Sequence, residues 1–190
     1  HRADLHRALL EAVRSIAPAA VVTGKALRAL RMDDATVTAE FSDGETHEAD
    51  WLVGCDGLRS TTRALLFGAE TPLFTGYVAW RGLVPSSQMR PEEIDPPLCM
   101  TVGPRRMLMR YPLRGGSLIN YVALARRAAW AEEGWSVRSE LRELLAEFAD
   151  FEPSCRRLLE QTPPDKCFQW GLFEREPLPT WIRGRAVLLG

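Results

Sequence analysis

The sequence predicts a mixed α/β (α+β) fold in two parts. Apolar residues recur at the helical period near the start of the chain, and they alternate with polar residues over 37–41, as in a half-buried strand. The segment GRAVLLG at 184–190 has the character of a fully buried strand from a parallel sheet. We expect 1–71 and 175–190 to form one domain, with 72–174 inserted as a second.

In the first domain, Asp4 is the predicted N-cap of a helix that Pro18 closes. Val22 lies at the start of an expected strand that runs past Gly24 toward Leu30. These features predict a helix followed by a strand.

A hairpin is expected next. The strand at 37–41 is followed by an Asp-Gly turn at 43–44, and the chain returns over 45–54. Together these segments predict a small β-meander that ends in the Gly-Cys-Asp-Gly turn at 54–57. A short helix is expected at 60–67.

The second part has the pattern of an antiparallel sheet, because Pro, Gly and charged turns separate its apolar runs. Its expected strands lie at 76–84, 98–102, 106–112, 117–124 and 166–174. Between the last two, helices are expected at about 137–149 and from Pro153 through Leu159.

Composition and charge narrow the class of protein. With 190 residues, 46% hydrophobic and 26% charged, the chain resembles an ordinary globular protein. A net charge of −1 gives no field that gathers nucleic acid, and no apolar run reaches the roughly 18–20 residues of a membrane span. Because its four cysteines show no CxxC spacing, we expect reduced thiols, a cytoplasmic location and no metal site.

The turn at 54–57 is the first candidate site. Gly54 and Gly57 permit positive φ and close backbone approach, and Asp56 can accept hydrogen bonds from ligand hydroxyls or backbone amides. The alternative is a capped strand-to-helix turn in which Asp56 satisfies local N–H groups. Arg59 and Arg63 could attract a dinucleotide phosphate, but a solvated helix face explains them equally, and we assign them no site role.

Five motifs in order resemble the flavoprotein monooxygenases of the para-hydroxybenzoate hydroxylase class, particularly the branch of salicylate and 6-hydroxynicotinate hydroxylases. These motifs are HRADLHRALL, ADWLVGCDGLRSTTR, GYVAWRGLVP, RYPLRGG and WIRGRAVLLG. The resemblance implies part of a Rossmann-like FAD-binding domain, over 1–71 and 175–190, with an inserted substrate domain over 72–174. It also implies an internal fragment that lacks the N-terminal GxGxxG unit and stops before the aspartate of the family's GD motif.

The resemblance further implies cofactor-binding residues. Arg2 matches an arginine that contacts the flavin, and the backbone of Val22 matches a position at the adenine end. Asp56 and Gly57 match the family's DG motif, which lies near the FAD pyrophosphate and the incoming nicotinamide cofactor. Gly190 ends the strand that leads to the flavin ribityl site. A solvent-facing arginine and a core valine remain the alternatives for Arg2 and Val22.

Substrate residues are expected on the inserted sheet. An aromatic beside a cation, Trp80-Arg81, could border a pocket for a planar acidic substrate, although packing is the other role for Trp80. The resemblance implies that Tyr111 is catalytic and contacts substrate; a surface-facing sheet tyrosine is the alternative. Where several relatives carry a histidine that assists deprotonation, this sequence has Met107, which cannot shuttle a proton.

The implied function is an FAD-dependent monooxygenase that hydroxylates a small, acidic aromatic compound with NAD(P)H and O2, and the resemblance allows a homodimer. The isolated fragment is expected to be inactive. One rival is another flavoprotein of the same fold, a halogenase or a reductase; the presence of only Lys25 and Lys166 argues against the halogenase. The other rival is a non-catalytic, truncated binding module.

Overall fold

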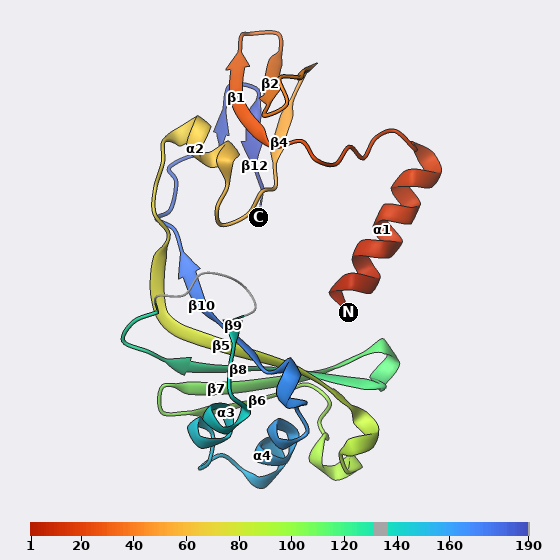
Figure 1. Ribbon diagram of the computed structural model, residues 1–190, viewed down its shortest axis with the longest axis vertical. Coiled ribbons are helices and arrows are strands. Elements are labelled where there is room, and N and C mark those ends of the chain that lie inside the picture. The colour runs from red at the N-terminus through yellow and green to blue at the C-terminus, as the bar shows by residue number, and fades with distance from the viewer. Residues whose placement is uncertain (131–136, 190) are drawn as a thin grey trace. The chain divides into compact units, whose positions relative to one another are not determined.

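The computed structural model describes residues 1–130 and 137–189, and the chain forms two compact units (Figure 1). One unit, called here the sheet unit, comprises Phe74–Phe173. The other, called the turn unit, comprises Arg2–Leu73 and the residues from Glu174 on. The mixed α/β prediction is confirmed, whereas the assignment of cofactor and substrate roles to the two parts stays a prediction.

A six-stranded sheet forms the sheet unit, with strand order β6-β7-β8-β5-β10-β9. The pairs β6–β7, β7–β8, β5–β8 and β9–β10 are antiparallel, as the turn-separated pattern predicts. The strands are β5 (Leu73–Pro85), β6 (Cys99–Gly103), β7 (Arg106–Leu113), β8 (Leu118–Arg126), β9 (Val137–Arg138) and β10 (Phe168–Glu174).

Two helices, α3 (Leu141–Glu147) and α4 (Pro153–Glu160), lie on one face of this sheet (Figure 1). The prediction of one helix over 137–149 is wrong at its start, because 137–138 pair with β10 as the short strand β9. Short 3₁₀ turns join the elements at Ser86–Gln88, Pro91–Glu93, Arg114–Gly116 and Pro164–Lys166.

The core of the sheet unit lies between the sheet and these helices. Alternate residues of β5 face it, because successive side chains of a strand point to opposite faces. Trp80 and Val84 are therefore buried there, whereas Arg81 and Leu83 are exposed. Trp80 packs edge-on against Phe148, with ring centroids 6.3 Å apart.

The turn unit contains α1 (Arg2–Ile16), α2 (Thr61–Phe67) and two three-stranded sheets. The first sheet is antiparallel, in the order β1-β2-β3, and the second has the order β11-β12-β4, with β12 parallel to β4. The strands are β1 (Leu27–Met32), β2 (Val37–Phe41), β3 (Thr46–Ala49), β4 (Leu52–Gly54), β11 (Ile182–Arg183) and β12 (Ala186–Leu188). Leu66 of α2 packs with Ala186 and Leu188 in the core of this unit.

Three expectations for this unit are wrong. The first helix begins at Arg2, so Asp4 lies inside its first turn, where a carboxylate suits the positive end of the helix dipole, and is not the N-cap. Val22 belongs to no strand; the positive φ of Gly24 (76°) interrupts the extended backbone, and β1 begins only at Leu27. The third concerns β4, which does not continue the meander, because the N–H of Leu52 donates to the carbonyl of Arg185 at 2.9 Å.

Substitution of Gly82 by alanine tests the packing of the core of the sheet unit. A Cβ atom at this position would lie 2.2 Å from Cε1 of Tyr121, its partner across the strands. We expect Gly82→Ala to lower the free energy of unfolding by about 1–3 kcal/mol, as overpacking does. Chemical denaturation measures the loss. In a Tyr121→Ala background the same methyl group should cost much less; an equal cost in both backgrounds would contradict the steric explanation.

Candidate functional site

The turn that follows β4 lies at the carboxyl end of the parallel pair β4–β12. The N–H of Leu189 donates to the carbonyl of Gly54 at 2.9 Å, so both strands end at the same edge. In sheets with parallel strands, ligands bind outside the carboxyl ends of those strands. The fold therefore puts the Gly54–Gly57 turn where a ligand site is expected.

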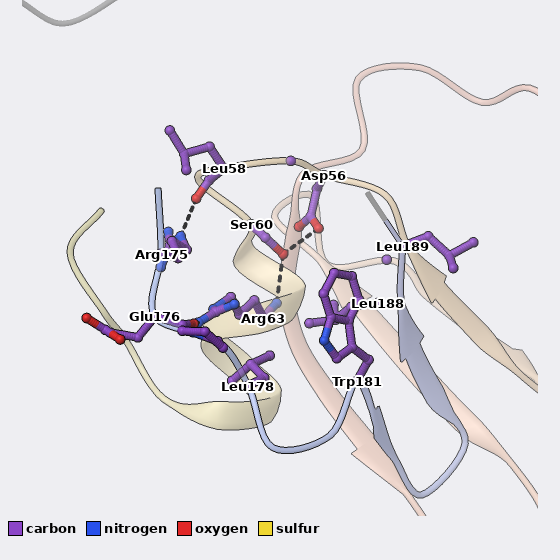
Figure 2. A pocket seen from close by; sticks show the side chains of 13 residues that line it. Asp56, Leu58, Ser60, Arg63, Arg175, Glu176, Leu178, Trp181, Leu188 and Leu189 are labelled. Carbon is purple, nitrogen blue, oxygen red and sulfur yellow. Dashed lines mark hydrogen bonds between the residues drawn. The ribbon is translucent and has the colours of Figure 1, made fainter. Parts of the chain in front are cut away.

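Asp56 organises this turn through its carboxylate. Oδ1 accepts a hydrogen bond from the hydroxyl of Ser60 at 2.5 Å, and Oδ2 accepts from the N–H and hydroxyl of Thr62 at 2.9 and 3.0 Å. The Ser60 hydroxyl oxygen in turn accepts from the N–H of Arg63 at 2.8 Å and caps α2 (Figure 2). Local capping, the alternative reading of Asp56, is thus part of what this carboxylate does.

The same contacts determine the charge of Asp56. Partial burial raises the pKa of the carboxyl group, but the hydrogen bonds from Ser60 and Thr62 outweigh burial and bring the pKa below its usual range. Asp56 is therefore ionised at neutral pH.

A pocket of about 350 Å³ opens beside this turn and lies wholly within the turn unit. Trp181, Leu188 and Leu189 give it an apolar wall (Figure 2). Gly57 borders it with φ 76°, and no atom lies within 4 Å of the place where a Cβ would sit. A side chain at position 57 would project into open space, so glycine leaves backbone accessible to a ligand.

Two arginines border the pocket and tie its segments together. Arg175 donates to the carbonyls of Leu58 at 2.5 Å and Glu70 at 2.9 Å. Arg63 donates to Glu70 Oε2 at 2.6 Å and to the carbonyl of Glu176 at 2.8 Å. The buried Nε of Arg63 has no hydrogen-bond partner within the described residues.

These arginines were not among the predicted site residues. The sequence offered Arg63 as a phosphate contact and a solvated helix face as its equal. The serine cap at Ser60 is the signal that could have decided between these two interpretations of Arg63. An arginine three residues after an N-cap lies in the first helical turn, beside the cap. Nothing in the sequence near Arg175 indicates that it meets Leu58, because 117 positions separate the two residues.

The predicted substrate residues divide between the two faces of the six-stranded sheet. Trp80 lies on the helix-covered face, 1% exposed, and its indole N–H donates to Ser139 Oγ at 3.0 Å, which agrees with a packing role. Tyr111 lies opposite Asn120 in the register, on the other face, and is half-buried. Arg81 is exposed on that same face, with its guanidinium carbon 5.2 Å from the ring centroid of Trp170.

We call this second surface the open face. Directly paired residues of antiparallel strands project to the same side, and so do alternate residues of one strand. Tyr111 and Met107 therefore share it, four residues apart on β7. The structure thus brings Tyr111, Met107 and Arg81 together on one face and separates Trp80 from them.

The remaining predicted cofactor residues are less informative. Arg2 is the first residue of α1, a helix that buries none of its side chains. Val22 is 59% exposed. Gly190 lies outside the described residues. Cofactor contact by these three residues stays a prediction.

Comparison with known proteins identifies the family. Residues 2–148 match the model of the FAD binding domain, so the chain belongs to this FAD-binding family. Within the described residues, no helix is long and apolar enough to span a membrane, and no cluster of three or more His, Cys, Asp or Glu side chains could hold a metal.

The relatives that match along the whole chain are aromatic hydroxylases. The chain is 35% identical over 195 residues to 6-hydroxynicotinate 3-monooxygenase of Bordetella bronchiseptica, covering 100% of the chain and 49% of that protein. It is 32% identical over 192 residues to 3-hydroxybenzoate 6-hydroxylase of Klebsiella oxytoca, covering 100% and 47%. The chain spans about half the length of the curated relatives that it matches.

Solved structures give the same result. A salicylate hydroxylase substrate complex superposes with a TM-score of 0.81 at 28% identity, covering 100% of this chain and 50% of that one. HpxO of Klebsiella pneumoniae, complexed with FAD and uric acid, superposes with a TM-score of 0.76 at 25% identity, covering 100% and 47%. The resemblance to the para-hydroxybenzoate hydroxylase class and the predicted fold class are confirmed.

Asp56→Asn tests the turn. Because the folded-state pKa of Asp56 lies below its unfolded value, ionisation of Asp56 stabilises the fold above the unfolded pKa, and this stabilisation is lost as the pH falls through the folded-state pKa. We expect the substitution to lower the free energy of unfolding at pH 7 by about 1.5–3 kcal/mol, the range for hydrogen bonds to a charged group. The difference should shrink below about pH 4.

Unfolding curves measured between pH 3 and 7 provide the measurement. Asp34→Asn is the control, since the side chain of Asp34 is exposed and makes no hydrogen bond in the part of the chain that the structure describes. A deficit for Asp56→Asn that does not change with pH would contradict the role of ionisation.

Proposed function

We propose that this chain is part of an FAD-dependent monooxygenase that uses NAD(P)H and O2 to hydroxylate a small, acidic aromatic compound. The observation that carries the proposal is the match of the entire chain, at 35% identity, to a 6-hydroxynicotinate 3-monooxygenase. The names of the other relatives, hydroxybenzoate and salicylate hydroxylases, support an aromatic ring that bears a carboxylate.

The pocket beside Asp56 fits part of the cofactor. Gly57 leaves its backbone open to a ligand. The buried Nε of Arg63, which has no hydrogen-bond partner among the described residues, is a cationic donor suited to a phosphate oxygen. Trp181 supplies an apolar surface against which a flat or aliphatic portion can pack. We propose that Arg63 and Gly57 bind a polar part of FAD, and that Asp56 stabilises the conformation of the turn through its hydrogen bonds.

FAD, when bound, supplies the redox chemistry that joins a two-electron donor to O2. Where the attacked ring carbon bears a hydrogen atom, the reaction is balanced when the ring C–H, NAD(P)H, O2 and a proton give the ring C–OH, NAD(P)⁺ and water. Where that carbon bears the carboxylate, as position 3 of 6-hydroxynicotinate does, the ring carboxylate, NAD(P)H, O2 and two protons give the ring C–OH, CO2, NAD(P)⁺ and water. The tasks left to this chain are to orient the ring, exclude water and hold protons at defined atoms.

The open face is the proposed substrate surface. Tyr111 combines a ring for packing with a hydroxyl that can donate to a substrate oxygen. Arg81 adds a positive charge on the same face, which suits a carboxylate. Because the thioether of Met107 cannot accept a proton, we propose that Tyr111 and not this position holds the substrate oxygen in its reactive form.

The rival functions have less support. Lys25 forms ion pairs with Asp43 and Glu45, 2.7 Å from the latter, and is therefore committed to the β2–β3 turn, which does not suit the reactive lysine of a halogenase. A non-catalytic binding module predicts flavin or aromatic binding without NAD(P)H consumption.

All four cysteines are free thiols, which supports a reducing compartment. We include a cytoplasmic location and a homodimer in the proposal.

Consumption of NAD(P)H tests the proposed activity. In the flavin-loaded enzyme, 6-hydroxynicotinate, salicylate or 3-hydroxybenzoate should accelerate NAD(P)H oxidation. Mass spectrometry should detect a product that has gained one oxygen atom, with loss of CO2 where the hydroxyl group replaces the carboxylate. Labelled ¹⁸O₂ identifies the source of that atom. Oxidation that no aromatic acid stimulates would contradict hydroxylation, and binding without oxidation would favour the binding module.

Tyr111→Phe tests the role of the phenol. The ring remains while one hydrogen bond to a substrate oxygen is lost, so kcat/KM should fall about ten- to hundredfold, because such bonds contribute about 1–3 kcal/mol. Trp80→Phe, a change on the covered face, is the control, since its effect should appear in thermal stability and leave KM near the wild-type value. An unchanged kcat/KM for Tyr111→Phe would contradict the assignment.

A further inference from the structure

Asn120 lies on the open face, on β8, the strand between β7 and β5. In the register of the sheet it lies opposite Tyr111 of β7 on one side and Leu83 of β5 on the other. Directly paired residues project to the same side at about 4.5–5.5 Å, so the three side chains form a row across three neighbouring strands. We call it the Tyr111–Asn120–Leu83 row.

The side chain of Asn120 is buried without being satisfied. It is 4% exposed, and its Nδ2 has no hydrogen-bond partner among the described residues. Burying an amide without an acceptor is costly, and buried polar groups in folded proteins nearly always have a partner. On the covered face, by comparison, the Trp80 indole bonds to Ser139 and the Tyr121 hydroxyl lies 2.6 Å from Thr162 Oγ1. The unsatisfied amide of Asn120 therefore indicates that an acceptor comes from outside this part of the chain.

The surroundings of Asn120 specify the acceptor. Leu83 offers an apolar surface and is 37% exposed, and Tyr111 offers a hydroxyl beside its ring. Arg81, two residues before Leu83 on the same face, carries a positive charge with no carboxylate partner in the described part of the chain. An apolar surface with several donors and a cation suits a planar ring that carries an anionic or carbonyl oxygen.

We propose that Asn120 is a substrate-binding residue whose side-chain amide donates a hydrogen bond to an oxygen of the aromatic acid, beside Tyr111. This inference rests on the proposed function and names a residue that sets its substrate class. Leu83 is partly exposed and Tyr111 is half-buried. Rotation of these two side chains can therefore open a path by which a substrate oxygen reaches the amide of Asn120. Nδ2 favours substrates with an acceptor at that position and selects against those with a donor only.

Binding to the flavin-loaded enzyme tests the proposal. The probes are 6-hydroxynicotinate, salicylate and 3-hydroxybenzoate, titrated against the flavin absorbance of wild type, Asn120→Ala and Asn120→Asp. We expect Kd to rise at least about tenfold for Asn120→Ala. It should rise further for Asn120→Asp, because a carboxylate repels an anionic oxygen. Flavin content should stay at the wild-type level in both variants.

A matched control removes another side-chain amide of the sheet unit. Gln88 is exposed in the turn at Ser86–Gln88, and Gln88→Ala should leave Kd unchanged. If Asn120→Ala does not fold, Asn120→Asp, which keeps the shape of the side chain, carries the test. Wild-type Kd in Asn120→Asp would overturn the proposal, as would a loss of thermal stability in both variants with Kd unchanged, which indicates a bond to another segment of the protein.

Two further outcomes separate this inference from the proposed function. If an aromatic acid binds and Kd depends on Asn120 but NAD(P)H oxidation is not stimulated, the hydroxylase proposal fails and the inference stands. If no aromatic acid binds to the wild type, both fail. Where salicylate binds, benzoate, which keeps the carboxylate and lacks the ring hydroxyl, identifies the oxygen: a Kd increase in Asn120→Ala that occurs with both compounds assigns the carboxylate, and an increase that occurs with salicylate and not with benzoate assigns the ring hydroxyl.

Discussion

The parallel pairing of β4 with β12 is the constraint on which the candidate cofactor site depends. Val53 of β4 lies opposite Val187 of β12, so two short strands that are far apart in sequence end at the same edge. Each strand has only three residues, and their hydrogen bonds alone cannot hold so long a loop closed. Burial of Leu66 against Ala186 and Leu188 provides the missing stabilisation, and α2 begins where the turn after β4 ends.

Asp56 therefore has two connected roles. Its hydrogen bonds to Ser60 and Thr62 fix the start of α2, and the resulting turn leaves Gly57 open toward the pocket. A carboxylate is needed because one side chain must accept three hydrogen bonds at once. Of the two roles that the sequence left open for Asp56, the hydrogen bonds show the structural one, and this role also shapes the wall of the pocket that we propose for the cofactor.

Local patterns predicted most of the elements and few of the long-range contacts. Alternation and turn residues predicted the antiparallel strands of the sheet unit, because a strand that is buried on one face carries a period of two. The same reasoning placed β4 in the meander and a strand at Val22, because it cannot see the pairing with β12 or the positive φ of Gly24. Arg175 was missed for the same reason, since its partners lie more than 100 positions away.

The two faces of the six-stranded sheet show how one strand can serve stability and function at once. Trp80 and Arg81 are neighbours in sequence and look like one aromatic–cation motif, yet the pleat sends them to opposite sides. The covered face satisfies the polar groups of Trp80 and Tyr121 with Ser139 and Thr162, so it can form a stable core without a ligand. On the open face, the amide Nδ2 of Asn120 has no acceptor among the residues that the structure describes, a cost that the stability of the sheet alone does not explain. A polar group kept at such a cost beside a tyrosine and an arginine is better understood as part of a binding surface than as part of a core.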